Sequence, residues 1–209
     1  MSTPLSSAET IDFGPLRIRY DERVLRPRPW TTEQSLWAAD LVVTAPEGRI
    51  LELCAGAGQI GLLTVSVAPR PLLCVDADRV ACDYARRNAD EAGLGPLVEV
   101  RQGRLEEALD DDERFAVVIA DPPWVPRDEI GRFPEDPVTA IDGGPDGLDL
   151  ARACLRVAAR HLLPGGSVIL QVGTRPQVDR LTAEPWPGLR LAEVRELDGG
   201  VLVRLDRTA

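Results

Sequence analysis

The chain has 209 residues, a length that fits one globular domain with a short appendage. Hydrophobic residues make up 44% and charged residues 28%, and no apolar stretch approaches the roughly 20 residues that span a bilayer, so we expect neither a disordered chain nor a membrane protein. The net charge of −10 disfavours nucleic acid as a partner, because a phosphate backbone is repelled unless the arginines cluster. Residues 1–10 lack the basic region and apolar core of a secretory signal, so we expect a cytoplasmic location.

The first predicted elements form an N-terminal arm. Residues 16–19 and 23–25 predict a weak pair of strands. Residues 26–31 include two prolines, which disfavour a helix, so we expect this segment to be extended. Thr31 and Thr32 are typical helix caps, and an apolar helical pattern follows them.

From residue 49 onward, apolar strands alternate with segments of helical length. The expected strands are residues 49–53, 71–75, 97–100, 115–120 and 167–172, and the clearest helices are 60–67 and 79–92, the latter capped by Asp78. Near-continuous apolar strands that alternate with helices predict a parallel sheet covered on both faces.

The C-terminal end has a different pattern. Residues 189–197 and 201–205 are separated by Asp-Gly-Gly, which is typical of an antiparallel hairpin. We therefore expect an α/β fold with a doubly wound, mostly parallel sheet of seven strands and an antiparallel C-terminal hairpin. In this interpretation residues 1–35 form the arm with its strand pair, and residues 36–209 form the main domain.

A long segment after the fourth strand has no convincing period. Residues 121–146 contain six of the chain's 18 prolines. Connections of this length without regular structure are typical of lids and binding loops.

A glycine motif predicts a cofactor site. Gly56-x-Gly58-x-x-Gly61 follows the first buried strand and opens a helix, and Asp76 lies at the end of the next strand. Glycines let a ligand approach the backbone, a helix N-terminus attracts an anionic group, and a carboxylate accepts hydrogens from ribose hydroxyls. The motif therefore indicates a nucleoside-containing cofactor. Glu52 narrows the choice of cofactor, since a carboxylate at this position can balance the charge of an ammonium or a sulfonium group but would repel a pyrophosphate.

A second motif, Asp121-Pro122-Pro123-Trp124, follows the fourth strand and should face the same crevice. The prolines stiffen the turn and leave a backbone carbonyl free, so a carboxylate and a carbonyl offer two acceptors beside a flat indole. A planar NH2 group fits this arrangement, because it can donate both hydrogens and stack on the ring. Such acceptors stabilise the positive charge that grows as nitrogen attacks an electrophile, which predicts methyl transfer from a sulfonium.

Nothing in the sequence indicates a metal site. The four cysteines have no Cys-x-x-Cys spacing, and His161, the single histidine, lies at the end of an apolar helix pattern. Methyl transfer from a sulfonium needs no metal, so this expectation agrees with the predicted chemistry.

The order of these motifs resembles that of the class I S-adenosylmethionine-dependent methyltransferases. Residues 27–31, 121–126 and 140–149 further resemble the HemK-like enzymes, which methylate a glutamine side-chain amide in translation release factors. The resemblance implies S-adenosyl-L-methionine as cofactor. It also implies three groups of site residues: Glu52, Gly56, Gly58, Asp76 and Arg104 for the cofactor; Asp121, Pro122 and Trp124 for catalysis; Arg28, Thr31 and Pro123 for the substrate.

Several positions depart from that family. Its Asn-Pro-Pro-Tyr is Asp-Pro-Pro-Trp here, its Pro-Arg-Pro-Glu-Thr is Pro-Arg-Pro-Trp-Thr, and Gly103-Arg104 replaces the acid that it carries near the adenine. The bacterial enzymes also have a helical N-terminal domain that contacts the release factor, whereas 26 residues precede Pro27 here.

We expect methyl transfer to a planar amide or amino nitrogen of a protein, peptide or small metabolite. The alternatives are a natural-product O- or N-methyltransferase, a nucleobase amino methyltransferase, and a non-catalytic cofactor-binding subunit. A nicotinamide oxidoreductase is disfavoured by Glu52 and by the absence of lysine, which removes a proton-donating Tyr-Lys pair. The sequence names neither the acceptor nor the oligomeric state.

Overall fold

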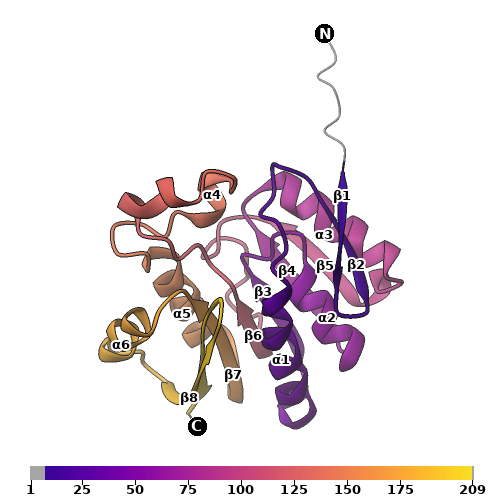
Figure 1. Cartoon of the computed structure of the whole chain (residues 1–209). Coiled ribbons are helices and arrows are strands. Elements are labelled where there is room, and N and C mark those ends of the chain that lie inside the picture. Colours follow the sequence, from indigo (N-terminus) through magenta and orange to yellow (C-terminus); the bar gives the residue numbers. More distant parts are fainter. Residues whose placement is uncertain (1–7, 209) are drawn as a thin grey trace.

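The computed structural model describes residues 8–208. Its centre is a seven-stranded sheet in the order β5-β4-β3-β6-β7-β9-β8 (Figure 1). Neighbouring strands from β5 to β7 are parallel, and β9 pairs antiparallel with both β7 and β8. The strands are β3 (Arg49–Leu53), β4 (Leu72–Asp76), β5 (Val98–Gln102), β6 (Phe115–Ala120), β7 (Leu162–Val172), β8 (Leu189–Leu197) and β9 (Gly200–Arg207). The expected α/β sheet with an antiparallel C-terminal hairpin is confirmed.

Helices cover both faces of this sheet. The helical elements are η1 (Pro29–Thr31), α1 (Thr32–Thr44), α2 (Gln59–Val67), α3 (Arg79–Glu91), η2 (Gly95–Leu97), η3 (Arg127–Arg132), α4 (Val138–Ile141), α5 (Asp149–His161) and α6 (Arg175–Ala183). Successive residues of a strand point to opposite faces, so Leu51 and Leu53 join one apolar cluster with α5 and α6, whereas Ile50 joins another with α1, α2 and α3. This two-sided burial explains the near-continuous apolar strands of the sequence.

The N-terminal strand pair differs from the prediction. β1 (Glu9–Phe13) pairs antiparallel with β2 (Leu16–Tyr20), and residues 23–25 form no strand. Gly14 has a φ of +58°, which allows the tight turn between β1 and β2. After β2, the Asp21 carbonyl accepts the Val24 N–H at 3.1 Å and its carboxylate accepts the Arg23 N–H at 3.0 Å, so the chain turns instead of pairing.

The proline-rich segment before α1 also differs from its prediction. Pro29–Thr31 is a turn of 3-10 helix, not an extended segment. A proline fits the first position of a helix, because an N–H at that position would have no partner within the helix. Thr31 occupies the N-cap position of α1, but its hydroxyl donates to the Arg28 carbonyl at 2.8 Å and caps no N–H. The helix that was expected to follow is α1.

No helix among residues 8–208 has the length and apolar character that crossing a membrane requires.

Candidate active site

Four strands bring the candidate residues to one edge of the sheet. The glycine loop follows β3, Asp76 ends β4, the Asp-Pro-Pro-Trp turn follows β6, and Gln171 lies next to the last residue of β7. β4 and β5 extend the sheet on one side of β3, while β6 and β7 extend it on the other. The crevice therefore opens where the strand order reverses, which is the usual ligand position in open α/β sheets.

The glycine loop has the backbone that its sequence predicts. Cys54, Gly56 and Gly58 have φ values of +57°, +54° and +82°. A Cβ atom on Gly56 would meet nothing within 4 Å, so this side of the loop is open to a ligand. A Cβ atom on Gly58 would lie 3.2 Å from the Ala85 side chain, which shows that Gly58 allows α2 and α3 to pack closely.

Asp76 holds the glycine loop in place through hydrogen bonds to backbone N–H groups. Its two carboxylate oxygens accept the N–H groups of Gly56 and Asp78, both at 2.8 Å. Burial raises the pKa of Asp76, and these two backbone donors oppose that shift. A carboxylate has about four lone-pair sites, so Asp76 can still accept hydrogens from two hydroxyls of a ribose.

Glu52 lies beneath the loop, with 2% of its surface exposed. One carboxyl oxygen accepts the Gly61 N–H at 2.9 Å, and the Cys74 thiol donates to the other at 3.1 Å. Gly61 is in the first turn of α2, where N–H groups lack helical partners, so Glu52 satisfies one of them and faces the positive end of the helix dipole. Burial nevertheless dominates and raises the pKa of Glu52 to about 7.

This buried carboxyl predicts a pH dependence of stability. A folded-state pKa of about 7 against an ordinary 4.5 means that the folded protein retains a proton that the unfolded chain has lost. The free energy of unfolding should therefore fall as pH rises between these two values. Glu52→Gln removes the titration, so the stability of the variant relative to the wild type should increase across this range.

Urea unfolding below pH 4.5 and above pH 7 measures this difference. Glu107→Gln, at an exposed carboxyl, is the matched control. Parallel pH profiles of wild type and Glu52→Gln would contradict the prediction.

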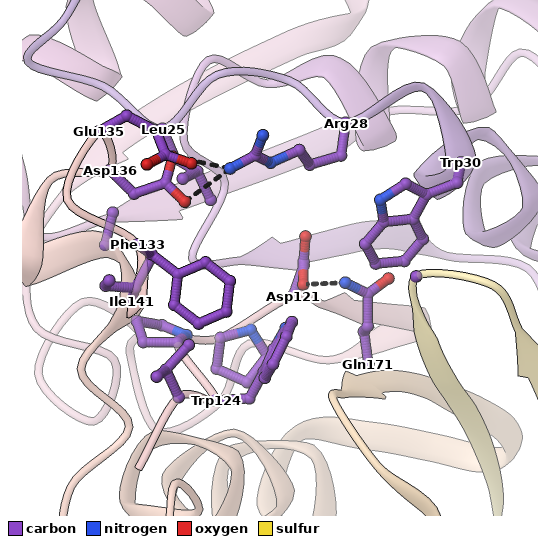
Figure 2. A pocket seen from close by; sticks show the side chains of 15 residues that line it. Leu25, Arg28, Trp30, Asp121, Trp124, Phe133, Glu135, Asp136, Ile141 and Gln171 are labelled. Carbon is purple, nitrogen blue, oxygen red and sulfur yellow. Dashed lines mark hydrogen bonds and ion pairs between the residues drawn. The ribbon is translucent and has the colours of Figure 1, made fainter. Parts of the chain in front are cut away.

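A pocket of about 300 Å³ lies over the Asp-Pro-Pro-Trp turn (Figure 2). Trp30, Trp124 and Phe133 supply aromatic walls, and Pro122 and Pro123 also line it. Figure 2 shows Asp121 and Gln171 together on one side, across the pocket from the Arg28–Asp136 pair. The pocket thus combines flat apolar walls with carboxyl groups, which suits a planar polar group.

Asp121 is the central polar group of this pocket. One carboxyl oxygen accepts the Gln171 side-chain N–H at 2.7 Å, and the other has no hydrogen-bond partner within residues 8–208. Burial raises the pKa of Asp121 to about 7. In the described part of the chain, the backbone carbonyls of Asp121 and Pro122 also accept no hydrogen bond. The turn therefore offers a carboxyl oxygen and a carbonyl as acceptors.

Contacts with Gln177 and Gly173 fix the position of Trp124. Its carbonyl accepts the Gln177 side-chain N–H at 2.8 Å, and its ring packs against Gly173, where any Cβ atom would collide with the indole. Gly173 follows β7 directly, so the ring of Trp124 is held between this strand end and the pocket.

The proposed substrate residues have different surroundings. The Arg28 guanidinium lines the pocket and forms an ion pair with Asp136 at 2.6 Å, so it links the N-terminal arm to the long segment after β6. Pro123 lines the pocket as well. Thr31 is buried and does not line it; its hydroxyl bonds the Arg28 carbonyl and so supports the arm.

Arg104, the remaining cofactor candidate, lies apart from the others. Its side chain is 82% exposed and lies 3.8 Å from Glu107. The neighbouring residue approaches the crevice, since the Gly103 N–H donates to the Asp76 carbonyl at 2.9 Å. The structure therefore brings together Gly56, Gly58 and Asp76 around one loop with Glu52 beneath it, but it leaves the Arg104 side chain exposed to solvent.

The long segment after β6 is more ordered than its sequence indicates. It contains η3 and α4, and Val125 forms a parallel bridge with Asp142. Asp142 also accepts the Gly144 N–H at 2.8 Å and faces the Arg127 guanidinium at 3.1 Å, and both donors lower the pKa of Asp142. The segment thus forms a folded wall of the pocket.

Sequence reasoning missed several residues of the site. Phe133, Glu135 and Asp136 line the pocket from the long segment after β6, where no local pattern identifies them, and Trp30 was noted only as a departure from the family motif. Gln171 could have been identified from the sequence, because a polar residue inside the apolar run of β7 is a candidate for a site residue.

Comparison with known proteins agrees with this fold. Residues 35–132 match the family model for the methyltransferase small domain. The chain is 34% identical over 184 residues to the ribosomal protein uL3 glutamine methyltransferase of Bradyrhizobium diazoefficiens, which covers 82% of this chain and 56% of that protein. It is 35% identical over 168 residues to the release factor glutamine methyltransferase of Streptomyces coelicolor, covering 76% and 58% respectively. The chain therefore spans somewhat more than half the length of these relatives.

A solved structure extends the comparison to the fold. The catalytic domain of hMettl16 superposes with a TM-score of 0.72 over 94% of this chain and 75% of that chain, at 18% sequence identity. This likeness shows the shared arrangement of strands and helices. By its sequence, the chain belongs to the class I methyltransferases, and it is similar to the glutamine methyltransferases among them.

Proposed function

We propose that the protein transfers a methyl group from S-adenosyl-L-methionine to the side-chain amide nitrogen of a glutamine in a protein acceptor. The observation that carries this proposal is the pair of free acceptors at the Asp121 turn, which lie under the wall formed by Trp124. A primary amide is planar, so it can stack on the indole and direct both N–H groups at those acceptors. The similarity to two kinds of glutamine methyltransferase supports an amide acceptor.

The residues of the glycine loop suit this cofactor. When bound, S-adenosyl-L-methionine supplies a methyl group activated by a positively charged sulfur. Asp76 would hold the ribose hydroxyls, and the open side of Gly56 would face the rest of the nucleoside and the methionine moiety. Glu52 beneath the loop adds negative charge when ionised, which favours a cationic ligand over a pyrophosphate. Arg104, whose side chain is exposed, would contribute little to this site.

The pocket residues would prepare the acceptor nitrogen. Asp121 and the adjacent carbonyls accept its hydrogens, which localises the nitrogen lone pair and stabilises the positive charge that develops there. With a pKa of about 7, the Asp121 carboxylate can also take up the proton that the methylated nitrogen must lose. Pro122, Pro123 and Trp124 fix the position of the amide plane.

A protein acceptor agrees with the charge of the molecule. The net charge is −10, and three carboxyl groups against one arginine line the pocket: Asp121, Glu135, Asp136 and Arg28. A phosphate backbone would be repelled by this surface. We further propose a cytoplasmic location, which suits acceptors such as a ribosomal protein or a release factor, and an arm over residues 1–35 that precedes the catalytic domain over 36–209.

The direct test is methylation with an isotopically labelled donor. The protein is incubated with cell extract and labelled S-adenosyl-L-methionine, and modified peptides are identified by mass spectrometry. Label on a glutamine side chain is the expected result. Label on RNA, or on amines only, would overturn the amide acceptor, and binding of NAD in place of S-adenosyl-L-methionine in calorimetry would overturn methyl transfer itself.

Asp76→Ala tests the cofactor site separately. Loss of hydrogen bonds to a charged group should weaken the binding of S-adenosyl-L-methionine by about 1.5–3 kcal/mol, or roughly 10- to 150-fold. Isothermal titration calorimetry on the folded variant measures this change, with Asp83→Ala, at an exposed site on α3, as control. Unchanged affinity in a folded Asp76→Ala variant would remove Asp76 from the site.

A further inference from the structure

Gln171 is a buried polar residue whose position needs an explanation. It lies in β7 with 1% of its surface exposed, and its neighbours Leu170 and Val172 are fully buried. Its side-chain N–H donates to Asp121 at 2.7 Å, and its amide oxygen is buried without a partner among the described residues. A buried amide that leaves its oxygen unpaired costs free energy. The bond to Asp121 is thus the one polar contact that this costly side chain makes in the described chain.

This bond determines which part of Asp121 faces the pocket. Gln171 occupies one carboxyl oxygen, and Figure 2 shows the other oxygen directed away from Gln171 toward the open part of the pocket. The donor also favours the ionised carboxylate and so opposes the effect of burial. Without Gln171, the carboxyl group could rotate and its charged form would lose its hydrogen-bond donor.

We propose that Gln171 is a positioning residue for methyl transfer, which holds the Asp121 carboxylate with one oxygen toward the acceptor nitrogen. This inference rests on the proposed function. Asp121 and Gln171 act as a carboxylate–amide pair across the ends of β6 and β7, and Gln171 does not touch the reacting atoms itself.

Other charged and titratable groups lie around Asp121. They come from the arm, the wall after β6 and the ends of β3 and β4: Arg28, Glu135, Asp136, Glu52, Cys54 and Asp76. Arg28 is already paired with Asp136, and the Cys54 thiol stays protonated because its pKa is raised well above the ordinary value. Burial is what disfavours the charged form of Asp121. Gln171 is therefore the one side-chain donor, within residues 8–208, that stabilises the ionised form of Asp121 by direct contact.

The test uses two variants of nearly equal volume. Gln171→Leu removes the donor, and Gln171→Glu places two carboxyls against each other. Gln102→Leu, at an exposed residue of β5, is the control. Recombinant ribosomal protein uL3 and a recombinant release factor serve as acceptors, and S-adenosyl-L-methionine is the donor.

Gln171→Leu should lower kcat about 10- to 150-fold, with KM and cofactor affinity within about twofold of the wild type. The midpoint of the acidic limb of the pH–rate profile should move to higher pH. Gln171→Glu should lower kcat at least as far. Unchanged kcat and pH profile in Gln171→Leu would overturn the proposal.

A second measurement does not depend on the acceptor. In protein labelled with carbon-13 at aspartate carboxyls, the titration of Asp121 should shift to higher pH in Gln171→Leu and remain unchanged in Gln102→Leu. An unchanged Asp121 titration would refute the proposed effect of Gln171 on the Asp121 carboxyl even if no acceptor is methylated. Conversely, a shifted titration in a protein that labels no glutamine in cell extract would refute the proposed function and retain the carboxylate–amide pair.

Discussion

Replacing Asp121 by alanine is expected to reduce turnover by about 100- to 1000-fold, with little change in the affinity for S-adenosyl-L-methionine. The carboxyl group lines the pocket, and in the proposed mechanism its interaction strengthens as positive charge develops on the attacking nitrogen. Its loss therefore raises the barrier of the chemical step more than it weakens ground-state binding. The cofactor site should be preserved, because Asp76 and the glycine loop have their own hydrogen bonds.

Single-turnover kinetics on the identified acceptor, together with calorimetry of the cofactor, measure the two quantities separately. Asp121→Asn adds a second comparison, since it keeps an acceptor oxygen and loses the charge. Near-wild-type activity of this variant would show that an acceptor oxygen is sufficient at this position and that Asp121 need not take up a proton, while a loss as deep as that of alanine would show that the charge of the carboxylate is required. Full turnover by Asp121→Ala would show that the proposed role of the Asp-Pro-Pro-Trp turn is wrong.

The second large effect is expected at Gly61, where alanine should destabilise the fold by about 2–4 kcal/mol. A Cβ atom there would lie 2.8 Å from the Leu72 side chain and would also collide with the Glu52 carboxyl. Helix propensity alone would favour alanine by about 1 kcal/mol. Overpacking costs about 1–3 kcal/mol and the disturbed Glu52 hydrogen bond about 1–3 kcal/mol, so the clash outweighs the propensity.

Urea unfolding of Gly61→Ala measures this loss of stability. Gly131→Ala is the matched control, because a Cβ atom on Gly131 would meet nothing within 4 Å. Equal stability of the two variants would mean that α2 can move away from β3 at no cost.

The sheet could be predicted because its residues carry a local signal. Ile50 and Leu51 are both apolar since each faces a different layer of helices, and this double burial produced the continuous runs that identified the strands. The glycine loop could also be predicted from the sequence, because the positive φ angles at Gly56 and Gly58 strongly favour glycine. The chain's first strand escaped prediction, since its polar sequence, Glu9–Phe13, is recognisable only from its pairing with β2.

The pocket depends on contacts that no local pattern contains. Arg28 and Asp136 are separated by 108 positions, and their pairing follows from the way the arm and the wall after β6 cross the crevice. The surroundings of Glu52 could not be predicted either. Its residue type suggested a charge near a ligand, but the sequence does not show that its carboxyl lies on the same face of β3 as Ile50 and bonds the start of α2.

The placement of the tryptophans gives the protein an internal optical reporter. Two of the chain's four tryptophans, Trp30 and Trp124, line the acceptor pocket. Trp37 is buried in the core beneath Arg195, and the Trp186 ring N–H donates to the Leu181 carbonyl at 2.7 Å. A chain with phenylalanine at positions 37 and 186 would retain fluorescence from the pocket alone. Its emission would then follow the entry and departure of an unlabelled acceptor in real time, separately from the methylation step.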